Sequence, residues 1–212
     1  MSGLHKLEGK NITFAYGREK LLLDRCSITL HRGERLALVG PSGCGKSTLA
    51  RILAGYLKPG SGGVFLDGKP LPPKGYCPVQ LIYQHPEKAV NPRLTLGKTL
   101  AESWKPDEVF LSRMGIEAPW LERYPRELSG GEIQRFCIAR ALGPETRFLI
   151  ADEMSAMLDV ITQAQIWKTL LEIVEQRQLG LLMITHNPYL ASAVSAPVVD
   201  LEGGCIGEVS GL

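Results

Sequence analysis

A glycine-rich segment at residues 40–48 has the residue types and the spacing needed to hold phosphate groups. It satisfies the pattern GxxxxGK[ST] and reads Gly40-Pro41-Ser42-Gly43-Cys44-Gly45-Lys46-Ser47-Thr48. Glycines let consecutive backbone N–H groups turn toward phosphates, and the positive end of a following helix adds to the attraction. Lys46 is long enough to reach the β- and γ-phosphates of a nucleotide, and Ser47 offers a hydroxyl to Mg²⁺. The alternative is an ordinary glycine-rich turn.

Two neighbouring carboxylates follow an apolar run. Residues 148–151 are Phe-Leu-Ile-Ala, and Asp152 and Glu153 come next. If the run is a strand, both acids lie at the carboxyl edge of the sheet, where open α/β sheets bind ligands. We expect Asp152 to hold Mg²⁺ through water, and Glu153 to accept a proton from, or orient, the water that attacks a γ-phosphate. Alternatively, both are solvated residues that start a turn.

A second glycine-containing segment, residues 128–135, has the pattern of a helix start. It reads Leu128-Ser129-Gly130-Gly131-Glu132-Ile133-Gln134-Arg135. The N–H groups of Ser129 and the two glycines, with the helix dipole, form a second phosphate-binding surface. Because the chain already has one phosphate loop, we expect this surface to serve a nucleotide bound to another subunit. Alternatively, Ser129 only caps a helix.

Short apolar runs rich in leucine or β-branched residues recur along the chain, at residues 35–39, 64–66, 79–83, 147–151 and 181–185. Several are almost continuously apolar, which is typical of strands buried on both faces of a parallel sheet. Helical patterns separate them, so the predicted fold class is α/β.

Three segments have the 3.6-residue apolar period of helices. The first follows the glycine-rich loop and ends near Gly55, and the second covers residues 130–142. The third covers residues 162–178, with an inward face predicted to hold Ala164, Trp167, Leu171 and Val174. Residues 85–125 are rich in proline, tryptophan and charge, and we interpret them as a mostly helical insertion.

Length and composition predict one domain with a small insertion. The chain has 212 residues, 44% of them hydrophobic and 22% charged, and a net charge of +2 gives no reason to expect a nucleic-acid partner. Its five cysteines are scattered without a CxxC pair, so neither a zinc site nor a disulfide framework is indicated, and reduced thiols are expected.

The sequence shows no signal for membrane insertion. The first ten residues lack the apolar core of a signal peptide, and the longest apolar stretches, such as residues 179–185, are far shorter than a bilayer span. Any membrane role is therefore expected to act through another protein.

Residues 128–135 resemble the LSGGQ signature of ATP-binding cassette (ABC) ATPases, and further landmarks of that family occur in the right order along nearly the whole chain. The resemblance implies a single domain, residues 1–212, with a P-loop NTPase core of the ABC type. It implies a core of residues 1–84 and 143–212, an antiparallel β portion near the N-terminus, and a helical subdomain at about 85–142.

Four further residues match family landmarks. Tyr16 resembles the A-loop aromatic that stacks on adenine, although a core aromatic is an alternative. Gln84 is similar to the Q-loop glutamine that contacts Mg²⁺ or water. His186 is similar to the switch histidine that holds the γ-phosphate and orients the carboxylate of Glu153. Asp159 resembles the last residue of the D-loop, which crosses a dimer interface.

The D-loop departs from the commoner wording PTSALD. Met154, Ala156 and Met157 stand where proline, serine and alanine are usual. The departure weakens any expectation of specific hydroxyl contacts from this loop, but it leaves the assignment of Asp159 in place.

The resemblance implies an ATP-hydrolysing subunit that powers a membrane transporter, with ATP and Mg²⁺ as cofactors. Two such subunits, the same chain or different chains, would pack head to tail, with each ATP between residues 40–48 of one and 129–132 of the other. The implied partners are transmembrane permease subunits and, indirectly, a solute-binding protein, and the implied location is peripheral, on the cytoplasmic face of the membrane.

Other ABC classes fit less well or remain open. DNA-repair relatives carry long coiled-coil insertions and translation-factor relatives carry two cassettes, and this sequence has neither. A catalytically dead module is disfavoured because Lys46, Asp152, Glu153 and His186 are all present. An exporter subunit, or a regulatory ABC protein without a transport role, stays an alternative.

The cargo is suggested by the region after Gln84. Residues 79–86 and 89–96 resemble the Q-loop region of oligopeptide, dipeptide and nickel importers, and residues 157–159 followed by Gln163 are similar to the same group. Peptides, nickel or another chelated metal are therefore the implied cargo. Alternatively, Asn91-Pro92-Arg93 only caps a helix, with the proline in its first turn. Those importers usually continue well beyond the core, and no such extension follows Val209 here.

Overall fold

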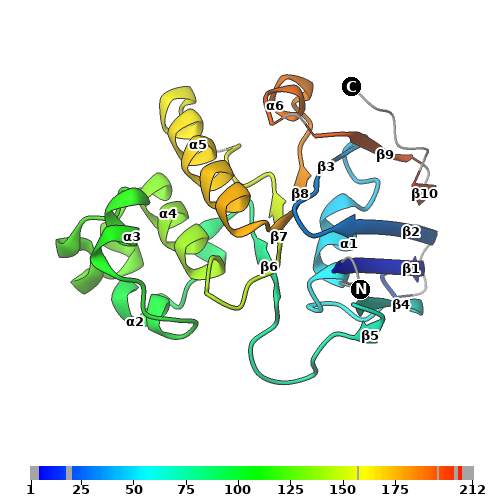
Figure 1. The fold of residues 1–212 in the computed structure, drawn as a ribbon, viewed down its shortest axis with the longest axis horizontal. Helices are drawn as coiled ribbons and strands as arrows, with labels where there is room; N and C mark the ends of the chain where they lie inside the picture. Colours follow the sequence, from blue (N-terminus) through cyan, green and yellow to red (C-terminus); the bar gives the residue numbers. More distant parts are fainter. Residues whose placement is uncertain (1–4, 18–20, 157, 195, 203–204, 207–212) are drawn as a thin grey trace.

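The structure is a computed structural model that describes residues 5–17, 21–156, 158–194, 196–202 and 205–206. Two residues named above, Met157 and Val209, lie outside this described part. Figure 1 shows helices at one end, an antiparallel sheet at the other and a parallel sheet between them.

An antiparallel sheet holds the N-terminal part of the chain. Its strand order is β2-β1-β4-β5, with β1 at Lys6–Phe14, β2 at Leu23–His31, β4 at Ser61–Leu66 and β5 at Lys69–Pro70. β1 pairs antiparallel with both β2 and β4. The predicted antiparallel portion is thus confirmed, and the predicted strand at residues 64–66 belongs to it.

The second sheet has the order β10-β9-β3-β8-β7-β6 among the described residues. Its strands are β3 (Arg35–Val39), β6 (Val79–Ile82), β7 (Phe148–Asp152), β8 (Gly180–Ile184), β9 (Val198–Glu202) and β10 (Cys205–Ile206). β10 pairs antiparallel with β9, and the other pairings are parallel.

Successive side chains of β7 alternate between two hydrophobic clusters. Leu149 and Ala151 join a cluster on the side of the helices, whereas Phe148 and Ile150 join a cluster shared with α1 (Lys46–Leu53) and the antiparallel sheet. Both faces of the strand are therefore buried, which is why its sequence is continuously apolar. The predicted parallel sheet is confirmed.

Helices α1, α5 (Val160–Arg177) and α6 (Pro188–Ala193) follow β3, β7 and β8 respectively. The end predicted for the first helix is confirmed, because α1 ends at Leu53 and Gly55 has a φ of 79°.

The predicted inward face of α5 is partly wrong. Ala164 is exposed and Leu171 is only half-buried. The buried stripe holds Ile166, Trp167, Leu170, Ile173 and Val174. The rotation of the helix follows the larger apolar side chains, because their burial removes more surface from water than that of an alanine.

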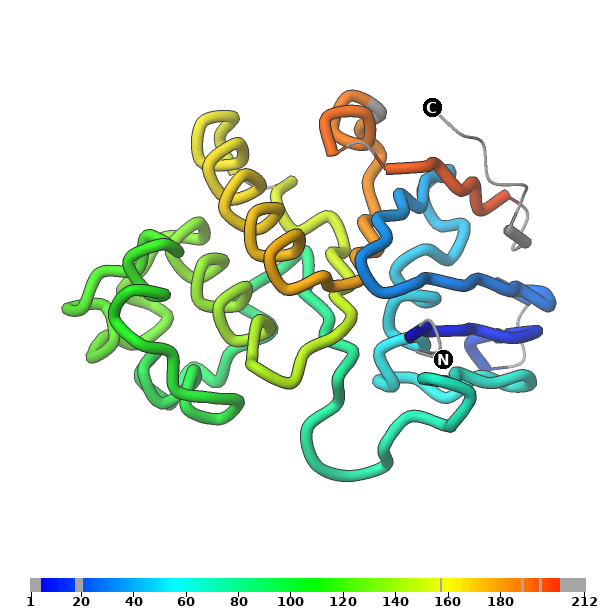
Figure 2. The backbone as a smooth tube through the Cα atoms, in the orientation of Figure 1, coloured from blue at the N-terminus to red at the C-terminus, as the bar shows by residue number. Residues whose placement is uncertain are grey.

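The described chain between β6 and β7 is helical. It contains α2 (Leu96–Ala101), α3 (Glu108–Arg113), α4 (Gly130–Ala141) and three short 3-10 turns, at Pro86–Lys88, Ala118–Glu122 and Pro125–Glu127. In Figure 2 a long connection leads from β5 to β6, and the helical segment follows β6. It occupies the stretch expected for a helical insertion, and the exact division of the chain at residues 85 and 142 stays a prediction.

The alternative reading of Asn91-Pro92-Arg93 as a helix cap is wrong. The Asn91 side chain accepts a hydrogen bond from the Arg93 N–H at 3.0 Å, and these residues form a turn. α2 begins at Leu96 with Thr95 as its N-cap, so Pro92 lies outside its first turn.

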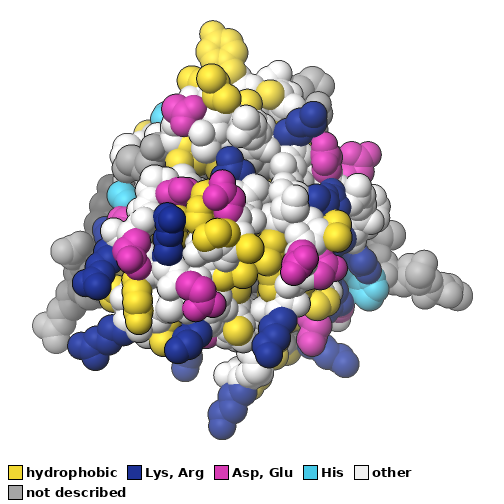
Figure 3. All heavy atoms as spheres, turned by 90° about the vertical axis from the view of Figure 1, so that its left-hand side faces the viewer, with side chains coloured by type: hydrophobic (Ala, Val, Ile, Leu, Met, Phe, Trp, Pro, Cys, Tyr) yellow, Lys and Arg dark blue, Asp and Glu magenta, His cyan; other side chains and the backbone are white. Residues whose placement is uncertain are grey.

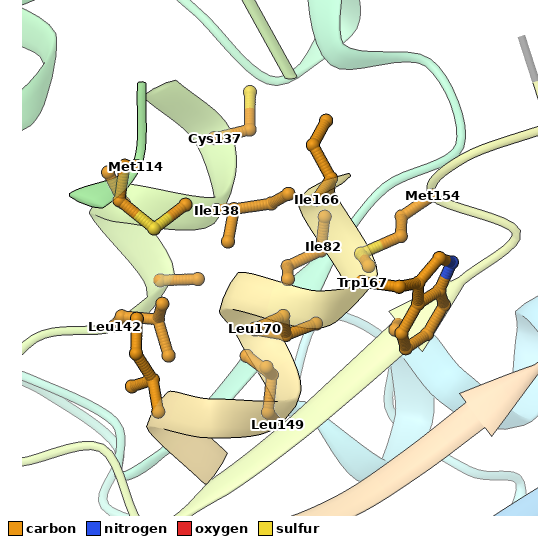
Figure 4. Close-up of a cluster of buried hydrophobic side chains, with 14 of the residues drawn as sticks. Ile82, Met114, Cys137, Ile138, Leu142, Leu149, Met154, Ile166, Trp167 and Leu170 are labelled. Atoms are coloured by element: carbon orange, nitrogen blue, oxygen red, sulfur yellow. The ribbon is translucent and has the colours of Figure 1, made fainter. Parts of the chain in front are cut away.

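The helices and the parallel sheet share one hydrophobic cluster. Figure 4 shows residues of α4, α5 and the strands interlocking there, among them Ile82, Ile138, Leu149 and Leu170. The outer surface of the helical end mixes apolar side chains with charges of both signs (Figure 3). Within the described residues, none of the helices is both long enough and apolar enough to cross a bilayer.

Candidate functional site

The glycine-rich loop joins β3 to α1 in a conformation that requires glycine. Gly40 has a φ of 142° and Gly45, the N-cap of α1, has a φ of 110°. A Cβ at Gly40 would lie 2.4 Å from the Leu201 carbonyl oxygen, and one at Gly45 would lie 2.8 Å from the Leu23 side chain. The path of the chain alone therefore fixes these residues as glycine.

Lys46 turns its ammonium group back into this loop. Its side-chain nitrogen donates to the Gly40 and Pro41 carbonyl oxygens, both at 2.8 Å, and the residue is only 8% exposed. A positive charge is thus held inside the ring of loop backbone where phosphates would be bound.

Asp152 lies buried below the loop. Ser47 donates its hydroxyl hydrogen to Oδ1 of Asp152 across 3.0 Å. Burial raises the pKa of the Asp152 carboxyl, the Ser47 hydrogen bond partly offsets this, and the nearby charge of Glu153 raises the pKa further. A cation beside Asp152 would stabilise the charged form of this carboxylate, which is largely shielded from water.

Glu153 is held from two sides. Gln84 donates from Nε2 to Oε2 of Glu153 at 3.2 Å, and Nδ1 of His186 lies 3.4 Å from Oε1. The three residues follow β6, β7 and β8, which are neighbours in the sheet. Residues far apart in sequence meet here because the carboxyl ends of parallel strands share one edge.

A cavity of about 540 Å³ connects these groups. It is lined by Leu22, Gly40, Ser42, Gly43, Gly45, Lys46, Ser47, Thr48, Gln84, Glu153 and His186. A larger cavity of about 680 Å³, which includes Tyr56, Tyr83 and Arg140, contains none of the predicted site residues. The smaller cavity is the candidate site, because the lysine, the carboxylate and the histidine all face it.

Tyr16 lies beside the first turn of α1. Its hydroxyl oxygen is 3.2 Å from Oγ1 of Thr48, and its ring packs edge-to-face on Phe14 at a centroid distance of 4.9 Å. The residue is 46% exposed, so the alternative of a core aromatic is wrong. An open aromatic face next to the phosphate loop is suited to stacking on a base.

The segment 128–135 starts α4 with a reciprocal cap. The Ser129 hydroxyl accepts from the Glu132 N–H at 3.3 Å, and Oε2 of Glu132 accepts from the Ser129 N–H at 2.6 Å. The hydrogen bonds to Ser129 hold the pKa of Glu132 below its usual value. Ser129 thus caps the helix and Oε2 of Glu132 takes part in that cap, while the alternative that Ser129 has no further role stays untested.

The two glycines of α4 are not required by the fold of this chain. A Cβ added to Gly130 would have nothing within 4 Å, and one at Gly131 would make ordinary contacts of 3.4 Å with Leu158 and 3.7 Å with Thr162. Neither Gly130 nor Gly131 has a positive φ. Ser129 and Gly130 are exposed, and no residue of this segment lines the 540 Å³ cavity.

Comparison with known proteins decides the family. A family model described as "ABC transporter" matches residues 23–156. The chain belongs to the ABC transporter family.

Two relatives illustrate where this ABC protein sits in the family. It is 38% identical over 207 residues to a putative peptide import ATP-binding protein of Brucella abortus (strain 2308), with 88% of the chain and 62% of the relative covered. It is 34% identical over 230 residues to the nickel import ATP-binding protein NikE of Escherichia coli (strain K12), with 97% of the chain and 86% of the relative covered. The chain thus spans about three fifths of the length of the Brucella relative.

The fold agrees with a solved ABC structure. The post-hydrolysis dimer of the ATP-binding cassette MJ0796 bound to ADP and Pi superposes with a TM-score of 0.81 at 24% identity, covering 97% of this chain and 98% of that one. The predicted α/β fold of the ABC type is confirmed.

Some residues assigned from the family pattern lie away from the cavity. Asp159 caps α5, with Oδ1 accepting from the Ile161 N–H at 3.1 Å and the Thr162 N–H at 3.0 Å. Pro41 and Cys44 belong to the phosphate loop but are not among the residues that line the cavity. A nucleotide contact by Asp159 or by residues 129–132 therefore stays a prediction that needs a second chain.

Sequence reasoning missed two features of the site. Leu22 lines the cavity, and nothing distinguishes it from the neighbouring leucines in the sequence. Ser155 is 3% exposed and accepts hydrogen bonds from Gln163 and Trp167. The sequence signal that could have identified Ser155 is a hydroxyl side chain two residues after Glu153.

The residues around Ser47 are chemically suited to Mg²⁺. The Ser47 hydroxyl and the Asp152 carboxylate lie 3.0 Å apart, and the Gln84 amide lines the same cavity. Mg²⁺ prefers oxygen ligands and is commonly held by one or two protein groups together with substrate phosphates and water. No cluster of three or more His, Cys, Asp or Glu side chains that could hold a metal occurs within the described residues, and a nucleotide site of this kind does not need one.

Proposed function

We propose that this chain binds Mg-ATP and hydrolyses it to power a membrane importer. The observation that carries the proposal is that Lys46, Glu153 and His186, from three separate parts of the sequence, line one cavity of about 540 Å³ next to a glycine-rich loop at a helix start. Phosphate binding and water activation thus have their groups in one place.

Binding relies on the loop and Lys46. The N–H groups of residues 43–48 and the start of α1 receive the phosphates, and the Lys46 ammonium leaves its carbonyl partners to pair with the β- and γ-phosphates. Tyr16 stacks on the adenine. Ser47 and Asp152, with Gln84, would hold Mg²⁺, which neutralises charge on the phosphate oxygens.

Hydrolysis relies on Glu153. The oxygen of a water forms a bond to the γ-phosphorus while the bond to the bridging oxygen breaks, which gives ADP and phosphate. The Glu153 carboxylate accepts the proton of that water. The contacts of 3.2 Å from Gln84 and 3.4 Å from His186 aim the carboxylate, and His186 reaches the γ-phosphate from the β8 side.

The site is completed by a second ABC ATPase subunit. Gly130 and Gly131 have room for a side chain within their own chain, and Ser129 and Gly130 are exposed. A close approach by a group outside the chain accounts for two adjacent glycines at a helix start. We therefore place residues 129–132 of one subunit against the γ-phosphate held by residues 40–48 of the other, with Asp159 at the interface.

The partners and cargo are proposed by analogy with relatives. Relatives of this chain include proteins described as import ATP-binding proteins for peptides, glutathione and nickel. We propose that the chain works at the cytoplasmic face of the membrane with two permease chains and a solute-binding protein, and that the cargo is a peptide, nickel or another chelated metal. An exporter or a regulatory ABC complex is the competing assignment.

Phosphate release from ATP by the purified chain tests the enzymatic proposal. We expect turnover that stops when EDTA removes Mg²⁺ and returns when Mg²⁺ is restored. Replacing the exposed Lys168 by alanine is the matched control and leaves turnover unchanged, since Lys168 lies on the outer side of α5. A wild-type chain without turnover, or turnover that EDTA does not affect, contradicts the proposal.

Gene deletion tests the cargo. We expect reduced uptake of labelled oligopeptide or of a nickel chelate, and copurification of the chain with a membrane protein of several spans. Normal uptake of both, together with a defect in exporting a lipid or drug, contradicts the import proposal and leaves the ATPase assignment intact.

A further inference from the structure

A buried serine close to Glu153 is held by two donors from α5. Ser155 is 3% exposed. Its Oγ accepts hydrogen bonds from Nε2 of Gln163 at 2.7 Å and from the indole N–H of Trp167 at 3.0 Å. Both lone pairs of the hydroxyl oxygen are thus used by side chains of one helix.

The two donors are rigidly placed. Gln163 and Trp167 are four residues apart, so they lie one above the other on the same face of α5. Trp167 is 5% exposed and lies at the edge of the hydrophobic cluster beside Met154, with its indole nitrogen turned away from the cluster (Figure 4). Asp159 caps the start of the same helix by accepting a hydrogen bond from the Ile161 N–H. The position of Ser155 is therefore set by a well-anchored helix.

Glu153 needs such support. Its φ of 45° places it in the left-handed region, which a residue with a side chain occupies only at an energetic cost. Such conformations persist where the surrounding structure holds them. Here the Glu153 N–H donates to the Ile184 carbonyl oxygen at 3.1 Å, and its own carbonyl oxygen accepts from the Ala156 N–H at 3.1 Å.

Space is available for Glu153 to move. A third cavity, of about 160 Å³, is lined by Glu153 and His186, which also line the phosphate cavity, and by Ser155, Gln163 and Trp167. The three hydrogen-bonded side chains thus border a cavity that Glu153 also lines. Without them, the loop after β7 has room to relax away from the phosphates.

We propose that Gln163 and Trp167 are positioning residues for Glu153, acting through the Ser155 hydroxyl. The proposal rests on the ATPase function proposed above. The pair of hydrogen bonds holds the loop that begins at Glu153, and so keeps the carboxylate at the distance from the γ-phosphate that water activation needs. ATP binding does not depend on it, because the phosphate loop and Lys46 lie on other elements.

Removal of the hydroxyl is the direct test. Ser155→Ala is expected to lower kcat about tenfold, since two hydrogen bonds to a positioned loop are lost, while the Kd for MgATP stays within about twofold of wild type. Ser155→Thr keeps the hydroxyl and restores the rate. Gln163→Met removes one donor at nearly constant volume, and Trp167→Phe removes the other together with part of the indole ring; each is expected to lower kcat about threefold. Gln165→Met, on an exposed position of the same helix, is the matched control and keeps the wild-type rate.

The background of Glu153→Gln separates positioning from a general loss of structure. If Ser155 acts through Glu153, adding Ser155→Ala to Glu153→Gln lowers the residual rate no further. An equal loss in both backgrounds, a raised Kd in place of a lowered kcat, or wild-type rates in Ser155→Ala and Trp167→Phe overturns the proposal. If Ser155→Ala fails to fold, Gln163→Met decides, because it removes one donor without leaving a cavity. An inactive wild-type chain overturns the ATPase function itself. An active wild-type chain whose variants keep the wild-type rate overturns only the positioning role.

Discussion

Two helix starts in this molecule carry glycines, and their surroundings differ. At α1 the glycines are demanded by the chain's own path, with Gly45 at a φ of 110°, and the loop faces a cavity that contains a lysine and a carboxylate. At α4 a side chain would fit at Gly130, the segment is exposed, and Ser129 and Glu132 are paired with each other in a reciprocal cap.

We interpret the first helix start as a phosphate site and the second as half of a site that two chains would share. The loop before α1 has the groups for phosphate binding and for water activation within one chain. The start of α4 keeps glycines that cost up to about 1 kcal/mol each relative to alanine in a helix, and nothing inside the chain explains them. Such a cost is understandable where another molecule must come close to the backbone.

The largest expected effect is at the α1 site. Lys46→Ala removes the charge that pairs with the β- and γ-phosphates, so ATP affinity should fall about 100-fold or more, as calorimetric titration would measure. Lys168→Ala, on the exposed side of α5, should bind as wild type does. Wild-type affinity in Lys46→Ala would show that Lys46 does not contribute to ATP binding.

Glu153→Gln should separate binding from chemistry within the same site. The amide cannot accept the proton of the attacking water, so kcat should fall roughly 100-fold or more while ATP affinity is retained. Single-turnover phosphate release measures the first quantity and equilibrium titration the second. Hydrolysis at the wild-type rate would show that Glu153 is not the base.

A pair of glycine substitutions sharpens the comparison between the two helix starts. Gly43 has a φ of 78°, so Gly43→Ala strains the loop and should lower the unfolding temperature by about 2–4 °C. Gly130→Ala has space and no positive φ, so it should raise the unfolding temperature by up to roughly 3 °C.

Both substitutions should nevertheless lower ATPase activity about tenfold or more, because in each case a methyl group keeps a phosphate away from backbone N–H groups. Thermal unfolding without nucleotide and steady-state turnover give the two readouts. If Gly130→Ala is both stabilising and fully active, the start of α4 is no part of the site.

The smallest expected effect on stability concerns the buried Asp152. Burial raises its pKa, so the folded chain holds that proton more tightly than the unfolded chain does, and stability is lost as pH rises from the ordinary value toward the raised one. Asp152→Asn should therefore raise the unfolding temperature at pH 7 by about 1–3 °C, while it abolishes Mg²⁺-dependent turnover. A lower unfolding temperature in Asp152→Asn, measured without nucleotide and Mg²⁺, would contradict this sign.

The core of the fold was predictable because its signals are local. The almost continuously apolar runs at 35–39, 147–151 and 181–185 are typical of strands buried on both faces, and the loop at 40–48 combines glycines, lysine and serine at fixed spacing. The rotation of α5 was not predictable from Ala164, because that choice depends on which neighbours the larger side chains meet.

The partners of individual side chains were equally hidden. The order of residues does not show that Ser155 accepts hydrogen bonds from Gln163 and Trp167. Nor does it show that the Asp159 carboxylate caps α5. These contacts depend on the angle at which the helix leaves the loop. Sequence patterns therefore identified candidate residues, and the structure was needed to show which of them line one cavity within the chain.

The most direct test of the two-chain site is the mass of Glu153→Gln in solution with and without MgATP. Slow hydrolysis lets the bound nucleotide persist, so we expect a monomer without nucleotide and twice that mass with MgATP, by size exclusion with light scattering. Adding Gly130→Ala should weaken that dimer, and adding Lys46→Ala should abolish it. A chain that stays monomeric at saturating MgATP, or a dimer whose mass and shape do not depend on nucleotide, would contradict the account.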